Sequence, residues 1–126
     1  MTPDDFRRIA RSLAGVEEGA HMGHADFRVG NRIFATLDQD AGDPGLGRGM
    51  VKLAVEEQEM RVAAAPAVFQ PVPGGWGWGG ATHVALAAAD EAMLTGALTA
   101  AWRLAVAQGP TRPRKRVVGA GKRLSP

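Results

Sequence analysis

The residues with the clearest chemical potential in this sequence are arginines placed around one tight turn. Arg28 and Arg32 flank the pair Gly30-Asn31, whose residues both tolerate the positive φ angles of a hairpin turn. Arginines beside the tip of a β-ribbon can contact phosphates or enter a groove of DNA, with Asn31 as a further polar contact. Three arginines near the N-terminus would extend a basic strip if their helix lies beside the hairpin: Arg7, Arg8 and Arg11. The alternative is that all these arginines are solvated surface charges, some of them paired with acidic neighbours: Asp4, Asp5 and Asp26.

The charges divide the chain into a mildly acidic body and a basic tail. Residues 1–109 hold nine Lys and Arg against thirteen Asp and Glu, a net charge of −4, whereas residues 110–126 carry +6. The body therefore gives no global attraction for phosphate, but the tail can add salt-sensitive affinity for nucleic acid. A purely solubilising tail is the alternative. Its basic residues are Arg112, Arg114, Lys115, Arg116, Lys122 and Arg123.

Aromatic and imidazole side chains offer a second kind of site. Trp76 and Trp78 lie in a glycine-rich segment, where exposed rings could stack on a nucleobase or a small ligand. Packing into the core beneath a turn is the more usual role of such residues, and we expect it here. His24 is expected to have a structural role, and in the alternative it joins the two tryptophans at a ligand surface.

The sequence contains no motif for catalysis or for cofactor binding, and only a weak indication of a metal site. It has no cysteine, and no nucleophile elbow, P-loop, zinc-protease or dinucleotide motif. A weak metal signal comes from His21, His24, Asp26 and His83. Two histidines three residues apart on a strand point to opposite faces, so we expect no metal site. The prediction is a protein that is not an enzyme and has no cofactor.

Hydrophobic alternation predicts two antiparallel strands on either side of the tight turn. A two-residue loop would pair Val29 with Arg32, whereas a three-residue loop of residues 30–32 pairs Val29 with Ile33. The three-residue loop puts the apolar residues on one face and leaves Arg28, Phe34 and Thr36 opposite. We therefore predict the three-residue loop, with a bulge. The apolar face is formed by Phe27, Val29, Ile33, Ala35 and Leu37.

Capping and periodicity predict the remaining elements. A first helix begins after Thr2 as N-cap and ends at Gly15, and residues 16–20 are a connector. A third helix begins after Asp90 and runs to about Gln108, apolar over much of its circumference and therefore deep against the sheet. Between these helices we predict a loop at 38–49, a strand at 50–55, a helix at 56–64, an edge strand at 68–72, a turn at 74–80 and a strand at 82–86.

The order of these motifs resembles the MmcQ/YjbR family of small bacterial proteins over residues 4–108. The matching segments are Leu13-x-Gly15-Val16-Glu17-Glu18, Gly23-His24-x-Asp26-Phe27-Arg28-Val29, Ile33-Phe34-Ala35, Phe69-x-Pro71-x-Pro73-Gly74, Trp76-Gly77, Thr82-x-Val84-x-Leu86 and Ala101-Trp102. The resemblance implies a compact α+β fold of the double-wing type, similar to CyaY, and DNA binding. The chain departs from the family pattern at Arg32, where Lys is usual, and at Ala81, where Trp is usual.

Together these observations predict an α+β domain over residues 1–109, with a mainly antiparallel sheet enclosed by N- and C-terminal helices and one inserted helix. Residues 110–126 are predicted to be a disordered basic tail. The expected function is weakly sequence-specific DNA binding through the hairpin and the tail. The alternative is a non-enzymatic domain that binds a protein or small ligand and no nucleic acid. We expect a cytoplasmic monomer, because no secretory signal or membrane-length apolar run is visible.

Overall fold

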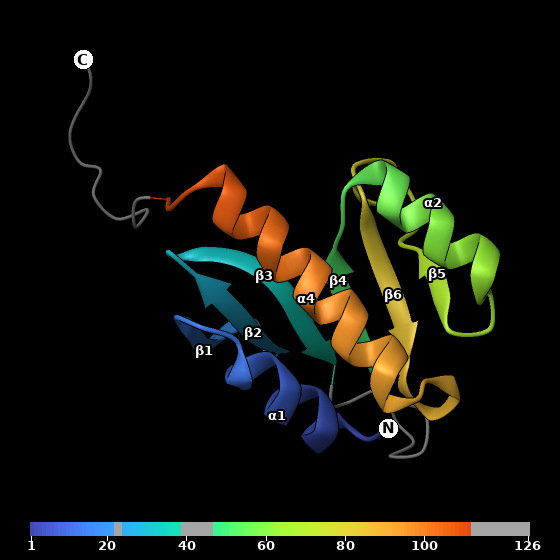
Figure 1. The fold of residues 1–126 in the computed structure, drawn as a ribbon, viewed down its shortest axis with the longest axis horizontal. Helices are drawn as coiled ribbons and strands as arrows, with labels where there is room; N and C mark the ends of the chain where they lie inside the picture. Colours follow the sequence, from blue (N-terminus) through green and yellow to red (C-terminus); the bar gives the residue numbers. More distant parts are fainter. Residues whose placement is uncertain (22–23, 39–46, 112–126) are drawn as a thin grey trace.

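A computed structural model of the chain describes residues 1–21, 24–38 and 47–111, which form four α-helices, a 3-10 helix and a six-stranded sheet (Figure 1). The helices are α1 (Pro3–Ser12), α2 (Val55–Ala64), α3 (Gly75–Trp78), η2 (Leu86–Ala88) and α4 (Glu91–Gln108). The strands are β1 (Val16–His21), β2 (His24–Val29), β3 (Arg32–Asp38), β4 (Arg48–Lys52), β5 (Phe69–Pro71) and β6 (Ala81–Ala85). All neighbouring strands pair antiparallel, in the order β1-β2-β3-β4-β6-β5. The predicted α+β class is confirmed.

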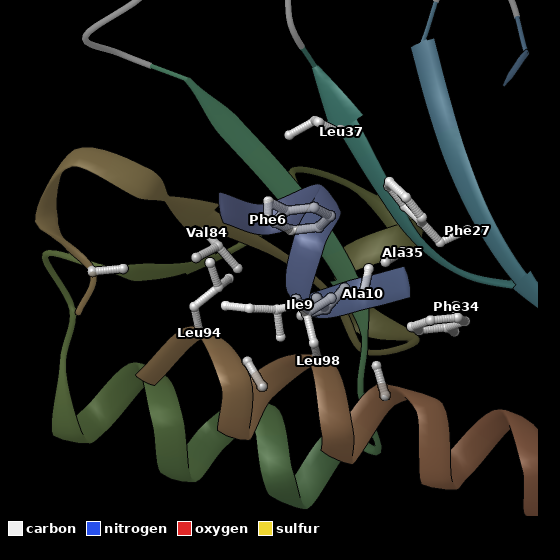
Figure 2. Close-up of a cluster of buried hydrophobic side chains, with 14 of the residues drawn as sticks. Phe6, Ile9, Ala10, Phe27, Phe34, Ala35, Leu37, Val84, Leu94 and Leu98 are labelled. Carbon is white, nitrogen blue, oxygen red and sulfur yellow. The ribbon is translucent and has the colours of Figure 1, made fainter. Parts of the chain in front are cut away.

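The hydrophobic core lies between one face of the sheet and the helices α1 and α4, which cross that face side by side (Figure 1). Apolar side chains of both helices meet those of the central strands in this layer (Figure 2). The largest fully buried members include Phe6, Phe27, Phe34, Leu37, Val84, Leu94 and Leu98. We call the opposite face of the sheet the open face, because none of the helices α1, α2 and α4 packs against it.

The helices α1 and α4 begin as their sequences predict. The Thr2 hydroxyl accepts a hydrogen bond from the Asp5 amide at 3.1 Å, and the Asp5 carboxylate accepts one from the Thr2 amide at 2.9 Å, which forms a capping box. The Asp90 carboxylate accepts from the Met93 amide at 2.8 Å at the start of α4. The apolar stripe of α4 is buried as expected. It comprises Leu94, Ala97, Leu98, Ala101 and Ala105.

The predicted three-residue hairpin loop is wrong, although the predicted bulge exists. Val29 pairs with Arg32 across a two-residue turn in which Gly30 and Asn31 both have positive φ, 58° and 63°. Farther from the turn Phe27 pairs with Ala35, the register that the three-residue loop would have given. The two registers are joined by a bulge at Phe34, which turns that side chain into the core at 1% exposure rather than to the opposite face. Ile33 consequently lies on the open face instead of the core face.

Other element boundaries also differ from the prediction. The expected connector at 16–20 is the edge strand β1, which pairing with β2 stabilises despite its polar sequence. The helix α1 ends at Ser12, before Gly15. The strand β4 begins at Arg48, inside the expected loop, and the expected turn at 74–80 contains the helical turn α3. Residues 39–46 of that loop and 112–126 of the tail lie outside the described residues.

In the part of the chain that the structure describes, no helix combines the length and the apolar character required to cross a membrane.

Candidate ligand groove on the open face

Arg28, one of the two arginines beside the predicted hairpin turn, is paired with a buried carboxylate. Arg28 donates from Nε to Asp26 Oδ1 at 2.9 Å and from Nη2 to Asp26 Oδ2 at 3.1 Å. The Asp26 side chain is 1% exposed and that of Arg28 is 33% exposed. Hydrogen bonding to Asp26 raises the pKa of the Arg28 guanidinium, and desolvation only partly offsets this effect. The two hydrogen bonds to Asp26 use Nε and Nη2 of Arg28, which are the donors that a guanidinium would offer to a phosphate.

The remaining hairpin groups also bond within the domain. Arg32 donates from Nε to the Gly109 carbonyl at 2.9 Å. Asn31 accepts a hydrogen bond from Arg28 at 3.4 Å through its side chain, and one from the Thr111 hydroxyl at 2.8 Å through its carbonyl. Because the ladder alternates, Arg28 lies on the open face and Arg32 on the helix-covered face. The two arginines therefore do not form one surface.

The arginines of α1 are paired with acidic side chains on the helix-covered side. Arg7 contacts Asp4 at 3.3 Å and Glu18 at 3.0 Å. Arg8 contacts Asp5 at 3.4 Å and Glu91 at 3.2 Å, while Arg11 lies 3.9 Å from Glu18. The continuous basic strip proposed from the sequence would require these side chains and Arg28 to share a face. The structure places them on opposite faces of the sheet.

The start of the basic tail is attached to the hairpin turn. The Thr111 amide donates to the Gly30 carbonyl at 2.8 Å, beside the bond from the Thr111 hydroxyl to Asn31. The residues of the predicted tail site that follow, Arg112, Arg114, Lys115 and Arg116, lie outside the described residues.

A groove of about 520 Å³ lies on the open face, which we call the open-face groove. One row of cross-strand neighbours runs through it, because Asp26 pairs with Thr36, Thr36 with Met50, and Met50 with His83. Adjacent strands are about 4.8 Å apart, so this row brings side chains from four strands together. The groove is lined by His24, Asp26, Ile33, Thr36, Asp38, Arg48, Gly49, Met50, Lys52, Val72, Trp76 and His83.

Asp38 is flanked by Arg48 and His24 at one end of the open-face groove. Asp38 lies 3.6 Å from Arg48 and 3.8 Å from His24. His24 is half exposed at the groove edge and is therefore a lining residue, where the sequence predicted a structural role. His24, Asp26 and His83, which the sequence raised as a weak metal signal, all line the groove. No group of three or more potential metal-ligating His, Cys, Asp or Glu residues is present among the described residues.

His83 lines the groove at the β6 end of this row, in an environment that favours its neutral form. Burial lowers the pKa of the His83 imidazole, and the positive charge of Arg48 lowers it further, while the Gly49 backbone and Asp38 act in the opposite direction. Its Nδ1 atom is buried and has no hydrogen-bond partner in the part of the chain that the structure describes. A buried polar atom without a partner is costly unless a bound group satisfies it.

The two tryptophans are exposed, and the prediction that they pack into the core is wrong. Trp76 is 70% exposed and Trp78 is 83% exposed. Trp76 lines the open-face groove, whereas Trp78 lines a separate depression that also includes Val55 and Pro73. The ligand surface considered from the sequence therefore joins His24 to Trp76 but not to Trp78.

A buried amide fixes the short helix that carries both tryptophans. The Gln58 side chain of α2 is 6% exposed and donates to the carbonyls of Gly77 and Ala81 at 2.9 and 3.1 Å and to the Thr82 hydroxyl at 3.1 Å. A Cβ atom at Gly77 would lie 1.8 Å from the Val72 carbonyl oxygen, so only glycine allows this close approach. These contacts pack the backbone of α3 inward and leave its indole rings outside.

Sequence reasoning missed several groove residues, above all Thr36, Arg48, Met50 and Lys52. The alternation of Arg48, Met50 and Lys52 along one strand could have placed them on a common face. Nothing in the local pattern indicates that this face is the one that α1, α2 and α4 leave uncovered. That property depends on the strand order and on the side from which α1 and α4 pack.

The fold is that of a small α+β domain with one helix-covered and one open sheet face. The model of the YjbR family matches residues 11–104, most of the chain, and the protein belongs to the YjbR family. Among solved structures, it is similar to the crystal structure of Deinococcus radiodurans protein DR2400, domain DUF419, with a TM-score of 0.71 and 24% sequence identity. That match covers 88% of this chain and 83% of the other, and shows the shared fold. A comparison with curated proteins gives no match.

Proposed function

We propose that this YjbR-family domain is a non-enzymatic binding module that takes a small organic ligand in the open-face groove. The observation that carries the proposal is the convergence of polar side chains from four strands on a groove of about 520 Å³, with the buried Nδ1 atom of His83 facing no partner among the described residues. Ligand sites combine this size with an apolar floor and a few directed polar groups. Ile33, Met50 and Val72 supply the apolar part of the lining.

A substitution that fills the groove without touching the core tests this proposal. Thr36 is half-buried on the open face, so Thr36→Phe should occupy the middle of the groove while keeping a good strand residue. A fragment library screened by ligand-observed NMR should give binders that contact the wild-type chain and lose at least about tenfold in affinity in Thr36→Phe, about 1.4 kcal/mol.

The matched control is Thr95→Phe, which places the same side chain at an exposed position of α4. Its binding should equal that of the wild type. The proposal is wrong if no fragment binds, or if both phenylalanine variants retain every binder.

The charge of the tail supports a second candidate function, non-specific DNA binding. Six basic residues and no acidic residue stand in 110–126, whereas the arginines of the hairpin and α1 are engaged within the domain. Of the two elements inferred from the sequence, the tail therefore has the stronger support as a DNA contact and the hairpin the weaker. An array of cations of this kind binds by releasing counterions from phosphates.

Fluorescence anisotropy with a labelled DNA duplex at a series of salt concentrations tests the DNA candidate. With six phosphate contacts, the slope of log K against log salt should be about −5. Replacing Arg114, Lys115 and Arg116 with Gln should reduce that slope by about 2.7, whereas replacing Arg7, Arg8 and Arg11 with Gln should leave it unchanged. DNA binding through the tail would be contradicted if no binding is seen at low salt. It would also be contradicted if only the chain with Arg7, Arg8 and Arg11 replaced loses affinity for DNA.

A further inference from the structure

We propose that the ligand of the open-face groove is a planar aromatic monocarboxylate, with its ring against Trp76 and its carboxylate on Lys52. This inference rests on the proposed function of the groove and adds the chemical class of the ligand. It follows from two features at the same end of the groove, a lysine without an ion pair among the described residues and an indole ring that is largely exposed.

The charges of the groove identify the position of the anion. Asp26 is neutralised by Arg28, and Asp38 is paired with Arg48. Lys52 lines the groove and forms no ion pair with a carboxylate of the described residues. A single negative charge delivered beside Lys52 would balance this cation. One unpaired cation matches a monoanion such as a carboxylate better than a phosphate dianion, which recruits several donors.

The ring of the ligand is inferred from Trp76. Its indole is 70% exposed and lines the groove. The Lys52 Nζ atom lies over the indole ring in a cation–π contact, 6.0 Å from the ring centroid. An exposed indole on a fixed backbone stacks on planar rings with little loss of conformational entropy. The bonds from Gln58 to Gly77 and Ala81 provide that fixed backbone. Val72 offers apolar contact beside the ring.

The two cations of strand β4 that line the groove differ in their partners. Arg48 and Lys52 are four residues apart on β4, a separation of about 13 Å along a strand. Arg48 already contacts Asp38, which leaves Lys52 as the strand β4 cation that we assign to the carboxylate. The groove volume of about 520 Å³ is enough for a ligand of one or two fused rings, and Thr36 and His83 of the lining offer polar contacts to it.

Three matched compounds separate the two parts of the proposal. 2-Naphthoate carries the ring and the charge, 2-naphthamide keeps the ring without the charge, and cyclohexanecarboxylate keeps the charge without the aromatic ring. In calorimetric titrations of the full chain, 2-naphthoate should bind at least about tenfold more tightly than either of the other compounds. Amide chemical shifts of β4 and α3 should move on addition of 2-naphthoate.

Variants of the two residues assign the contacts. Lys52→Met should weaken 2-naphthoate about tenfold and leave 2-naphthamide unchanged, and Trp76→Leu should weaken both aromatic compounds by a similar factor. The controls are Trp78→Leu, which removes an indole from the same segment outside the groove, and Arg103→Met, which removes an exposed charge from α4. Both controls should bind as the wild type does. Lys52, Trp76, Trp78 and Arg103 are all exposed, so each variant should keep the wild-type unfolding temperature.

The proposal is overturned if 2-naphthamide binds as tightly as 2-naphthoate, or if Lys52→Met leaves 2-naphthoate binding unchanged. Tighter binding of 2-naphthyl phosphate than of 2-naphthoate would also overturn the assignment to a monocarboxylate. If none of these compounds binds but library fragments are still excluded by Thr36→Phe, the aromatic carboxylate is wrong and the groove remains the ligand site.

Discussion

Replacing Arg28 with Met is expected to lower the free energy of unfolding by about 3 kcal/mol. The substitution leaves the Asp26 carboxylate, which is 1% exposed, without the two hydrogen bonds of 2.9 and 3.1 Å that compensate its burial. A buried charge that loses its partner is among the few single changes with so large an effect. Urea denaturation at neutral pH, followed by tryptophan fluorescence, measures the loss.

The matched control is Arg8→Met, which removes an arginine of the same predicted DNA site from an exposed position. The side chain of Arg8 is 55% exposed and pairs with Asp5 and Glu91, which are 31% and 60% exposed. Exposed pairs of this kind contribute about 0–1 kcal/mol. Adding Asp26→Asn to Arg28→Met should restore part of the lost stability, because the unpaired charge is removed. An Arg28→Met chain as stable as the Arg8→Met chain would contradict a structural role for Arg28 and return it to the candidates for phosphate contact.

The parts of the fold that follow from neighbouring residues could be predicted from the sequence. Thr2 and Asp90 cap their helices because a short polar side chain beside the first turn can bond the free amides whatever the tertiary structure. The buried stripe of α4 follows from helical periodicity in the same way. Family membership was also predictable, because the ordered motifs span the same region that the YjbR model matches.

The hairpin register could not be predicted because two local preferences compete there. Gly30 and Asn31 satisfy the positive φ angles of a two-residue turn, while the apolar alternation of residues 27–37 requires the register of a three-residue loop. The structure satisfies both by inserting Phe34 as an extra residue. Burial of a phenylalanine ring stabilises the bulge by about 1.5–3 kcal/mol relative to an exposed ring, an energy that depends on α1 and α4 being present.

The site was only partly predictable, because it depends on which sheet face stays uncovered. His24 and Trp76 were identified from residue type. Their common groove exists because side chains from β2 and from α3 face the same side of the sheet. The charged residues of the hairpin and α1 were identified as an external binding strip, yet their partners Asp26, Glu18 and Glu91 hold them within the domain. Residue type indicated the available chemistry, and the strand order decided whether each group faces solvent or a neighbour.

Replacing Gly80 with Ala is expected to lower the free energy of unfolding by at least about 3 kcal/mol, because two separate penalties coincide at this position. Gly80 has a φ of +106°, a conformation that side chains rarely adopt. A Cβ atom there would also lie 1.9 Å from the Leu53 carbonyl oxygen, and a backbone atom cannot rotate away as a side chain can. The Leu53 amide donates to the Gly80 carbonyl at 3.0 Å, so the shift that relieves the clash breaks this bond. Thermal unfolding should show a loss of about 10 °C or more.

The adjacent glycine supplies a control that isolates this geometry. Gly79 has a φ of −86°, and a Cβ atom there would have its nearest contact at 3.6 Å, with the Trp76 carbonyl oxygen. Gly79→Ala should therefore change the free energy of unfolding by no more than about 0.5 kcal/mol. The contrast also bears on the groove, because Gly80 connects α3 to β6 and so determines where Trp76 lies relative to Lys52. A Gly80→Ala chain as stable as Gly79→Ala would mean that the contact between residues 53 and 80 is loose, and α3 would then not hold the indole in the fixed position that ligand stacking requires.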